Sequence, residues 1–190
     1  MKKLEETFRS RRTVLDTVAM RRAIRRLGHQ LVEDAVDVSN LALIGVRTRG
    51  VPLARRLAKV IAEAEGVEPP VGELDITLYR DDVFEGLAVP EVRPTLLPFE
   101  VRGRHIVLVD DVLYTGRTIR AALDALMDWG RPHCIRLAVL VDRGHRELPL
   151  HADYVGSTVS TALGESIEVC LAEIDGEDEV RHWSEPEVER

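Results

Sequence analysis

The sequence predicts an α/β fold, in which one mostly parallel sheet is flanked by helices and carries a small hood at its C-terminal end. Three short apolar runs, at residues 41–46, 106–109 and 134–141, are nearly unbroken by polar residues. Such runs are typical of strands that are covered on both faces of a sheet. Segments with a helical period accompany the runs, and this alternation of strand and helix favours parallel pairing.

Three helices are expected around these strands. In residues 15–36 an apolar stripe repeats at about 100° per residue and consists of Met20, Ile24, Leu27 and Leu31. The second helix starts near Pro52, which suits a first helical position, and ends near Gly66. The third helix covers residues 118–129. Each apolar stripe is expected to pack against the sheet.

The remaining segments are less regular. Residues 73–78 are expected to form another strand, whereas residues 80–100 are polar, contain prolines and predict a loop or long hairpin, in which residues 83–100 have no assigned role. Strand-like pieces at 153–156 and 167–174 predict a small hood, followed by a frayed acidic tail. The 190 residues are thus expected to form a single domain, with a core at about 15–150 and the hood and tail at about 151–190.

The composition favours a cytoplasmic protein with no membrane association. A hydrophobic content of 45% suffices for a core, and no apolar stretch is long enough to span a bilayer. The charged start of the chain lacks the apolar stretch of a secretory signal. Cys134 and Cys170 lie in apolar runs and are expected to be buried free thiols. The net charge is −7, but residues 1–26 are mainly basic and residues 165–190 mainly acidic, which indicates a localised anion-binding face.

The strongest functional signal follows the apolar run at residues 106–109. The chain continues into a helix through Asp110, Asp111, Val112, Leu113, Tyr114, Thr115, Gly116, Arg117 and Thr118. In open parallel sheets, ligands bind beyond the carboxyl ends of the strands. The helix start and its glycine suit a phosphate, whereas the two carboxylates suit sugar hydroxyls or a hydrated Mg²⁺. A ribose 5-phosphate matches this order of charges.

A simple helix cap would explain Asp110 and Asp111 but not the threonines and the glycine beside them. No P-loop and no dinucleotide-binding glycine motif is present. Residues 107–118 instead closely resemble the signature loop of type I phosphoribosyltransferases. This resemblance implies the type I phosphoribosyltransferase fold and a site for 5-phosphoribosyl-1-pyrophosphate, whose ribose 5-phosphate contacts residues 110–118. In this site the two acids bind the ribose hydroxyls, and residues 114–118 wrap the 5′-phosphate.

A second strand–turn–helix segment lies at residues 43–50. Its turn contains Arg47, Thr48 and Arg49, and paired guanidinium groups suit a diphosphate. Arginines in a turn are more often simply solvated. Beside the first loop, however, this turn resembles the diphosphate loop of the same family. Arg80 opens the irregular segment and is a candidate catalytic residue on a lid that excludes water from the reacting sugar, with an ordinary surface loop as the alternative.

Two further stretches, at residues 74–82 and 141–149, together with Tyr114, resemble the PyrR family, whose members combine pyrimidine operon attenuation with uracil phosphoribosyltransferase activity. The resemblance covers about residues 23–174. It implies conversion of uracil and 5-phosphoribosyl-1-pyrophosphate to UMP and diphosphate, and UMP- or UTP-responsive binding to leader RNA of pyrimidine transcripts. It also implies a homodimer or larger homo-oligomer. Mg²⁺ would bind mainly through the substrate, with Asp110 and Asp111 as candidate direct ligands.

The chemistry assigns roles to these residues. Loss of diphosphate leaves a sugar with oxocarbenium character, so catalysis depends mainly on positioning and on stabilising the leaving group. Asp110 and Asp111 are expected to hold the sugar, and Arg47, Arg49 and Mg²⁺ to stabilise the diphosphate. Some purine-using relatives carry an acid where Tyr114 stands. Its absence favours an acidic pyrimidine such as uracil, whose ring proton needs less help.

A basic face on the first helix is the candidate RNA-binding surface. It consists of Arg21, Arg22, Arg25, Arg26 and His29, opposite the apolar stripe. A charged helix face is usually only solvated, but this one lacks the acids at i+4 that would normally balance it. Arg143 and Arg146 are expected to extend the face. RNA binding would combine phosphate contacts with stacking on arginine planes, because aromatic residues make up only 4% of the chain.

Three functional hypotheses stay open at this point. The chain is an enzyme that also regulates through RNA, a plain salvage phosphoribosyltransferase without RNA binding, or a ligand-sensing regulator with vestigial catalysis. Residues 153–158 are candidates for reading the uracil ring. Whether regulation acts through transcription termination or through translation is not decided by the sequence.

Overall fold

A computed structural model describes residues 10–35, 37–81 and 92–184. Its main sheet has five parallel strands in the order β3-β2-β4-β5-β6. These strands are β2 (Leu41–Val46), β3 (Val71–Leu74), β4 (His105–Leu113), β5 (Cys134–Asp142) and β6 (Tyr154–Thr158). The predicted α/β class, with a mostly parallel sheet flanked by helices, is confirmed.

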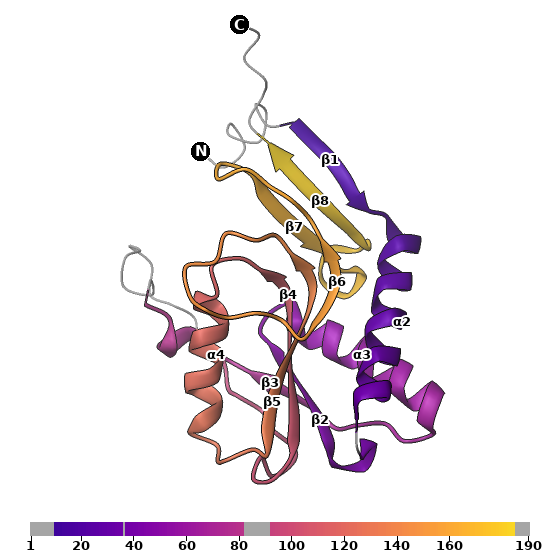
Figure 1. Ribbon diagram of the computed structural model, residues 1–190, viewed down its shortest axis with the longest axis vertical. Coiled ribbons are helices and arrows are strands. Elements are labelled where there is room, and N and C mark those ends of the chain that lie inside the picture. The colour runs from indigo at the N-terminus through magenta and orange to yellow at the C-terminus, as the bar shows by residue number, and fades with distance from the viewer. Residues whose placement is uncertain (1–9, 36, 82–91, 185–190) are drawn as a thin grey trace, which may run out of the picture.

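Helices cover both faces of this sheet (Figure 1). They are α2 (Thr17–Asp34) and α3 (Gly50–Glu65) on one face and α4 (Arg117–Met127) on the other. Successive residues of β4 alternate between the two cores: Val107 packs with α2 and α3, whereas Leu108 packs with α4. This double burial explains why the central strands are apolar throughout.

The predicted helices agree with the structure within a few residues. The first starts at Thr17 because the Asp16 side chain caps it by accepting a hydrogen bond of 2.7 Å from the amide of Ala19. Its predicted stripe of Met20, Ile24, Leu27 and Leu31 is buried. The strand expected at 73–78 is shorter, since β3 ends at Leu74 and a 3₁₀ turn (Thr77–Tyr79) follows.

A second, three-stranded antiparallel sheet forms the hood at one end of the main sheet (Figure 1). Its order is β1-β8-β7, with β1 (Ser10–Leu15), β7 (Ser166–Cys170) and β8 (Glu179–Ser184), and a short helix α5 (Ala172–Asp175) follows β7. The hood therefore joins the N-terminal strand to the C-terminal part of the chain. Residues 185–190 of the predicted tail lie outside the described residues.

Three expectations about the periphery were wrong. Residues 154–158 belong to the main sheet as its edge strand β6 rather than to the hood. Residues 179–184, predicted to be frayed, form the central hood strand. The strand at residues 10–15 was not predicted at all. These strands were misassigned because short half-exposed strands carry no local signal of the sheet that they join.

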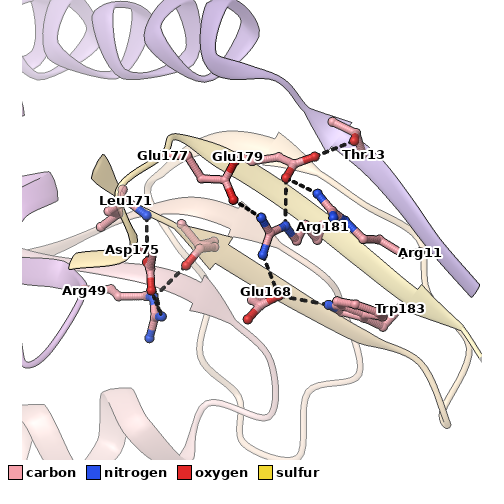
Figure 2. Close-up of polar contacts among 11 residues, drawn as sticks. Arg11, Thr13, Arg49, Glu168, Leu171, Asp175, Glu177, Glu179, Arg181 and Trp183 are labelled. Atoms are coloured by element: carbon pink, nitrogen blue, oxygen red, sulfur yellow. Dashed lines mark hydrogen bonds and ion pairs between the residues drawn. The ribbon is translucent and has the colours of Figure 1, made fainter. Parts of the chain in front are cut away.

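Polar contacts hold the hood strands together (Figure 2). The carboxylate of Glu179 on β8 accepts hydrogen bonds from Thr13 and Arg11 on β1, both at 2.5 Å, and from Arg181 at 2.7 Å. The bonds from Thr13 and Arg181 lower the pKa of Glu179 to about 2. Glu168 on β7 accepts a bond of 3.0 Å from the indole of Trp183. No helix in the described ranges combines the length and apolar character that a membrane crossing requires.

Candidate phosphoribosyl site

The predicted site residues gather at the carboxyl ends of β2, β4 and β5. Because β2 and β4 are parallel neighbours, the loops that follow them emerge at the same edge of the sheet. Gly50 brings the two together: a Cβ atom there would lie 2.2 Å from the carbonyl oxygen of Val109. The turn at residues 47–49 is therefore held directly against β4, next to Asp110.

Asp110 and Asp111 lie inside β4, which continues to Leu113 instead of ending at residue 109 as predicted. Asp110 is 6% exposed. Burial, and then the neighbouring charge of Asp111, raises the pKa of Asp110 well above its usual range, and burial also raises the pKa of Asp111. The charge of Arg80 opposes this shift at Asp110, and that of Arg49 opposes it at Asp111. The structure thus brings both arginines near the acidic pair.

The loop after the acidic pair lines a cavity of about 300 Å³. All the predicted phosphate-binding residues from Val112 to Thr118 contribute to its wall, together with Arg80, Asp81 and Ile119. Gly116 has a φ of 93°, which only glycine adopts readily, and α4 begins directly after it. The first amides of a helix have no partners within the helix. The cavity therefore lies at a helix start, whose free amides suit an anion.

Arg117 also lines this cavity, but its side chain is paired with two carboxylates. Its guanidinium is about half exposed and pairs with Asp81 at 2.7 Å and Glu147 at 2.6 Å. These two carboxylates engage its side chain. A phosphate in the cavity is thus best met by the backbone amides and hydroxyls of the loop.

The candidate diphosphate loop contains Arg47, Thr48 and Arg49, and the Arg47–Thr48 peptide bond is cis. The guanidinium of Arg47 donates to Glu73 at 2.5 Å, and its Nε finds no acceptor among the described residues. Arg49 is hydrogen-bonded to the hood instead. Its Nε donates to the carbonyl of Val169 at 2.6 Å, and its Nη2 donates to Asp175 at 3.0 Å. The hood therefore holds one of the two predicted diphosphate ligands.

Arg143 and Arg146 do not extend the basic face of α2, which corrects our expectation. Arg143 is 7% exposed, and it donates to Thr161 and to the carbonyl of Glu165. Arg146 is occupied by Asp142 and by backbone carbonyls that include that of Tyr114 at 2.7 Å. Both side chains therefore hold loops at the edge of the site.

Tyr114 has partners that the sequence did not reveal. The guanidinium of Arg143 lies 4.1 Å from the centre of its ring, within the range of a cation–π contact. The ring of His145 approaches it edge-on at 6.0 Å, and His145 Nε2 is hydrogen-bonded to Thr161 at 2.6 Å. The stretch at 141–149 was expected to resemble the PyrR family and to extend the basic face of α2, not to contact Tyr114. Its contact with Tyr114 depends on a distant loop, which no local pattern indicates.

The basic face of α2 is exposed at Arg21, Arg22, Arg25 and His29. Arg26 is exposed as well, but its guanidinium donates to the carbonyl of Gly156 on β6 and so ties the helix to the edge of the main sheet. The α2 basic surface, as we define it from here on, therefore consists of Arg21, Arg22, Arg25 and His29.

Comparison with known proteins places this site in a family. Residues 10–173 match the family model described as the phosphoribosyl transferase domain, and the chain belongs to this family of phosphoribosyltransferases. Within it, the chain is 57% identical over 176 residues to the bifunctional protein PyrR of Thermus aquaticus, which covers 93% of this chain and 97% of the relative. It is 58% identical to that of Deinococcus radiodurans, over 87% of this chain and 91% of the relative. These identities place it in the PyrR family.

Solved structures agree at the level of the fold. A hypoxanthine phosphoribosyltransferase from Staphylococcus aureus matches with a TM-score of 0.66 and 18% identity, over 94% of both chains. The enzyme of the same name from Trypanosoma cruzi matches with a TM-score of 0.68 and 18% identity, over 91% of this chain and 90% of the other. The predicted type I phosphoribosyltransferase fold is therefore confirmed.

Proposed function

We propose that this protein transfers the phosphoribosyl group of 5-phosphoribosyl-1-pyrophosphate to uracil, giving UMP and diphosphate, and that it binds leader RNA of pyrimidine transcripts in response to UMP or UTP. One observation carries the enzymatic half. The buried Asp110 and its half-buried neighbour Asp111 meet the cavity of residues 112–118 and the loop of Arg47–Arg49 at one edge of the sheet. The relatives named bifunctional PyrR support the combination of two activities.

We propose a role for each part of the site. Asp110 and Asp111 accept hydrogen bonds from the ribose hydroxyls, which compensates the cost of burying two carboxylates. The loop amides and the hydroxyls of Thr115 and Thr118 hold the 5′-phosphate at the start of α4. Arg49 meets the departing diphosphate, where a guanidinium stabilises the negative charge that develops as the glycosidic bond breaks.

The residues present fit a substrate-borne Mg²⁺. Asp110 and Asp111 offer hard oxygen donors, and their burial leaves them in need of a cation or of hydroxyl groups. Within the described ranges, no group of three or more His, Cys, Asp or Glu residues could hold a metal on its own. When bound, Mg²⁺ neutralises charge on the diphosphate. Asp110 and Asp111 orient the ribose beside it.

Uracil is proposed to bind beside Tyr114. The Arg143 guanidinium stacks on the Tyr114 ring, and position 114 carries no carboxylate that could act as a base toward the substrate ring. This arrangement supports uracil as the substrate, because its ring needs no strong proton acceptor from the loop. Residues 153–158 remain candidates for reading the ring, and their C-terminal end reaches the same edge of the sheet, because the amide of Val159 donates to Asp142 at 2.9 Å.

The α2 basic surface is proposed to bind RNA phosphates. Its exposed basic side chains lie on a helix whose opposite, apolar side is packed in the core, so they face solvent together. A plain salvage phosphoribosyltransferase remains the alternative, with this surface merely solvated. We also propose that the protein acts in the cytoplasm as a homodimer or a larger homo-oligomer, as the family resemblance implies.

Two assays on the purified protein test the proposal. Uracil-dependent release of diphosphate from 5-phosphoribosyl-1-pyrophosphate tests the transferase. A gel-shift with pyrimidine leader RNA at fixed salt, with and without UMP, tests the regulator. Turnover without any RNA shift would establish the salvage alternative. An RNA shift without turnover would establish a sensor with vestigial catalysis.

A further inference from the structure

The short turn that follows hood strand β7 is bonded to the start of α3 by two arginines. Arg49, the last residue before α3, reaches Val169 and Asp175. About two turns later, Arg56 donates to Glu173 and to Asp178, the latter at 2.7 Å. The acidic residues of the C-terminal segment thus gather on the element that carries the candidate diphosphate loop, and Figure 2 shows the contact to Arg49.

Asp175 is a firmly held anchor for Arg49. Its Oδ2 accepts a hydrogen bond of 2.9 Å from the amide of Leu171, and its own amide donates to the Leu171 carbonyl at 2.7 Å. Leu171 and Val169 are buried in the core, at 0% and 1% exposure. The carboxylate and the Val169 carbonyl are therefore fixed relative to the main sheet, and so is the edge of the guanidinium that they bind.

The rest of the Arg49 guanidinium is left available for a ligand. A guanidinium carries five N–H groups. The bonds to the hood use Nε and Nη2, and Nη1 makes no hydrogen bond with any residue in the described ranges. Besides its bonds to the hood, Arg49 is close enough to Asp111 for its charge to oppose the rise that burial causes in the pKa of that carboxyl. Its side chain is 33% exposed, which gives a ligand access.

We propose that Asp175 is a positioning residue for the diphosphate group. It binds one edge of Arg49 so that the opposite edge stays aimed at the leaving group. An arginine loses much conformational freedom when it binds an anion, and a side chain that is already fixed loses less. This inference rests on the proposed function, since it takes Arg49 to be the diphosphate ligand. It assigns to the hood a part in substrate binding that is separate from any contact with uracil.

Asp175→Asn tests the proposal with little change of shape. The asparagine oxygen can still accept from the amide of Leu171, but its amide group cannot accept from Arg49. We expect the Kd for diphosphate in the presence of Mg²⁺, measured by calorimetry, to rise about tenfold. The KM for 5-phosphoribosyl-1-pyrophosphate should rise similarly. The Kd for UMP, which has no diphosphate, should not change.

Asp178→Asn is the matched control. Asp178 lies on the same turn, accepts from the amide of Ala172 at 2.9 Å and binds Arg56 instead of Arg49. The Asp178→Asn variant should leave the Kd values for diphosphate and UMP unchanged. If both variants weaken the binding of diphosphate and of UMP equally, Asp175 is only structural and the proposal is overturned. Tighter diphosphate binding in Asp175→Asn would also overturn it, because Asp175 would then compete with the ligand for Arg49.

Arg49→Ala separates this proposal from the one on which it rests. If Arg49→Ala leaves diphosphate binding unchanged, the proposed ligand role of Arg49 fails. If Arg49→Ala weakens diphosphate binding but Asp175→Asn does not, only the positioning role fails. If both the ligand role of Arg49 and the positioning role of Asp175 hold, the double variant Arg49→Ala/Asp175→Asn should bind diphosphate no more weakly than Arg49→Ala alone. The reason is that Asp175 acts only through the Arg49 side chain.

Discussion

The contact between Gly50 and β4 offers a sharp test of how the site is assembled. In Gly50→Ala, the new Cβ would lie 2.2 Å from the carbonyl oxygen of Val109 and 3.4 Å from the Cα of Asp110. Real Cβ atoms essentially never come closer than 3.0 Å to another heavy atom, so the loop and the strand must separate by at least 0.8 Å, the difference between 3.0 and 2.2. Both partners are backbone, and β4 is the central strand of the sheet.

This separation should affect stability and activity together. Overpacking of a core contact typically costs about 1–3 kcal/mol, and for a chain of this size each kcal/mol lowers Tm by about 2–4 °C. A displacement near 1 Å between groups that act on one substrate can cost about 100-fold in rate. We therefore expect a lower Tm and a fall of roughly 10- to 100-fold in kcat/KM for 5-phosphoribosyl-1-pyrophosphate.

Gly72→Ala is the control, because the nearest atom to its new Cβ is the tip of the Leu97 side chain at 2.5 Å. A flexible side chain can move where backbone cannot, so this variant should lose less than about 1 kcal/mol and keep its kcat/KM. Thermal unfolding and the diphosphate-release assay on both variants give the comparison. If Gly50→Ala unfolds and turns over like the parent protein, the two loops do not depend on this approach, and the reasoning is refuted.

Three further predictions concern the acidic pair, the RNA surface and the hood. Asp111→Asn should lower uracil-dependent diphosphate release by about 100-fold or more, since it replaces one of two negatively charged ribose acceptors with a neutral amide that keeps a single acceptor oxygen; unchanged release would show that the assigned site is wrong. Arg22→Ala/Arg25→Ala should weaken leader RNA binding and lower the salt slope by about 1–2, with transferase activity intact; equal affinity at fixed salt would contradict this. Glu179 has a lowered pKa of about 2 through its bonds from Thr13 and Arg181, so its stabilising effect is complete above about pH 4.5 and is lost as pH falls toward 2. Denaturant unfolding at pH 3–7 should therefore show a steeper acid loss in the parent than in Glu179→Gln, and parallel curves would exclude the effect.

The central fold and the substrate loops could be read from the sequence because their signals are local. The run at residues 41–46 is buried on both faces and so is apolar at every position, and the stripe from Met20 to Leu31 has the period of a helix with one buried face. The phosphate loop, with Asp110 and Gly116, is likewise one contiguous stretch. A phosphate cradle at a helix start needs few residues that are distant in sequence.

The arginines show what the sequence could not decide. Arg26, Arg49 and Arg143 were each assigned from the turn or helix face that carries them, yet their partners are Gly156, Asp175 and Glu165, more than a hundred residues away in two cases. A long flexible side chain can reach many acceptors, and only the packing of the chain selects one.

Contacts between distant segments also explain why the hood could not be predicted from the sequence. Its strands β1 and β8 are short, rich in charge and only partly buried, so neither an apolar run nor a regular alternation marks them. They exist because they pair with each other across almost the whole length of the chain. The sequence by itself thus determined a parallel α/β core with a phosphoribosyl loop at the end of its central strand. The tertiary structure alone decided which side chains the hood holds in place around that loop, because such contacts depend on where distant segments meet rather than on any local period.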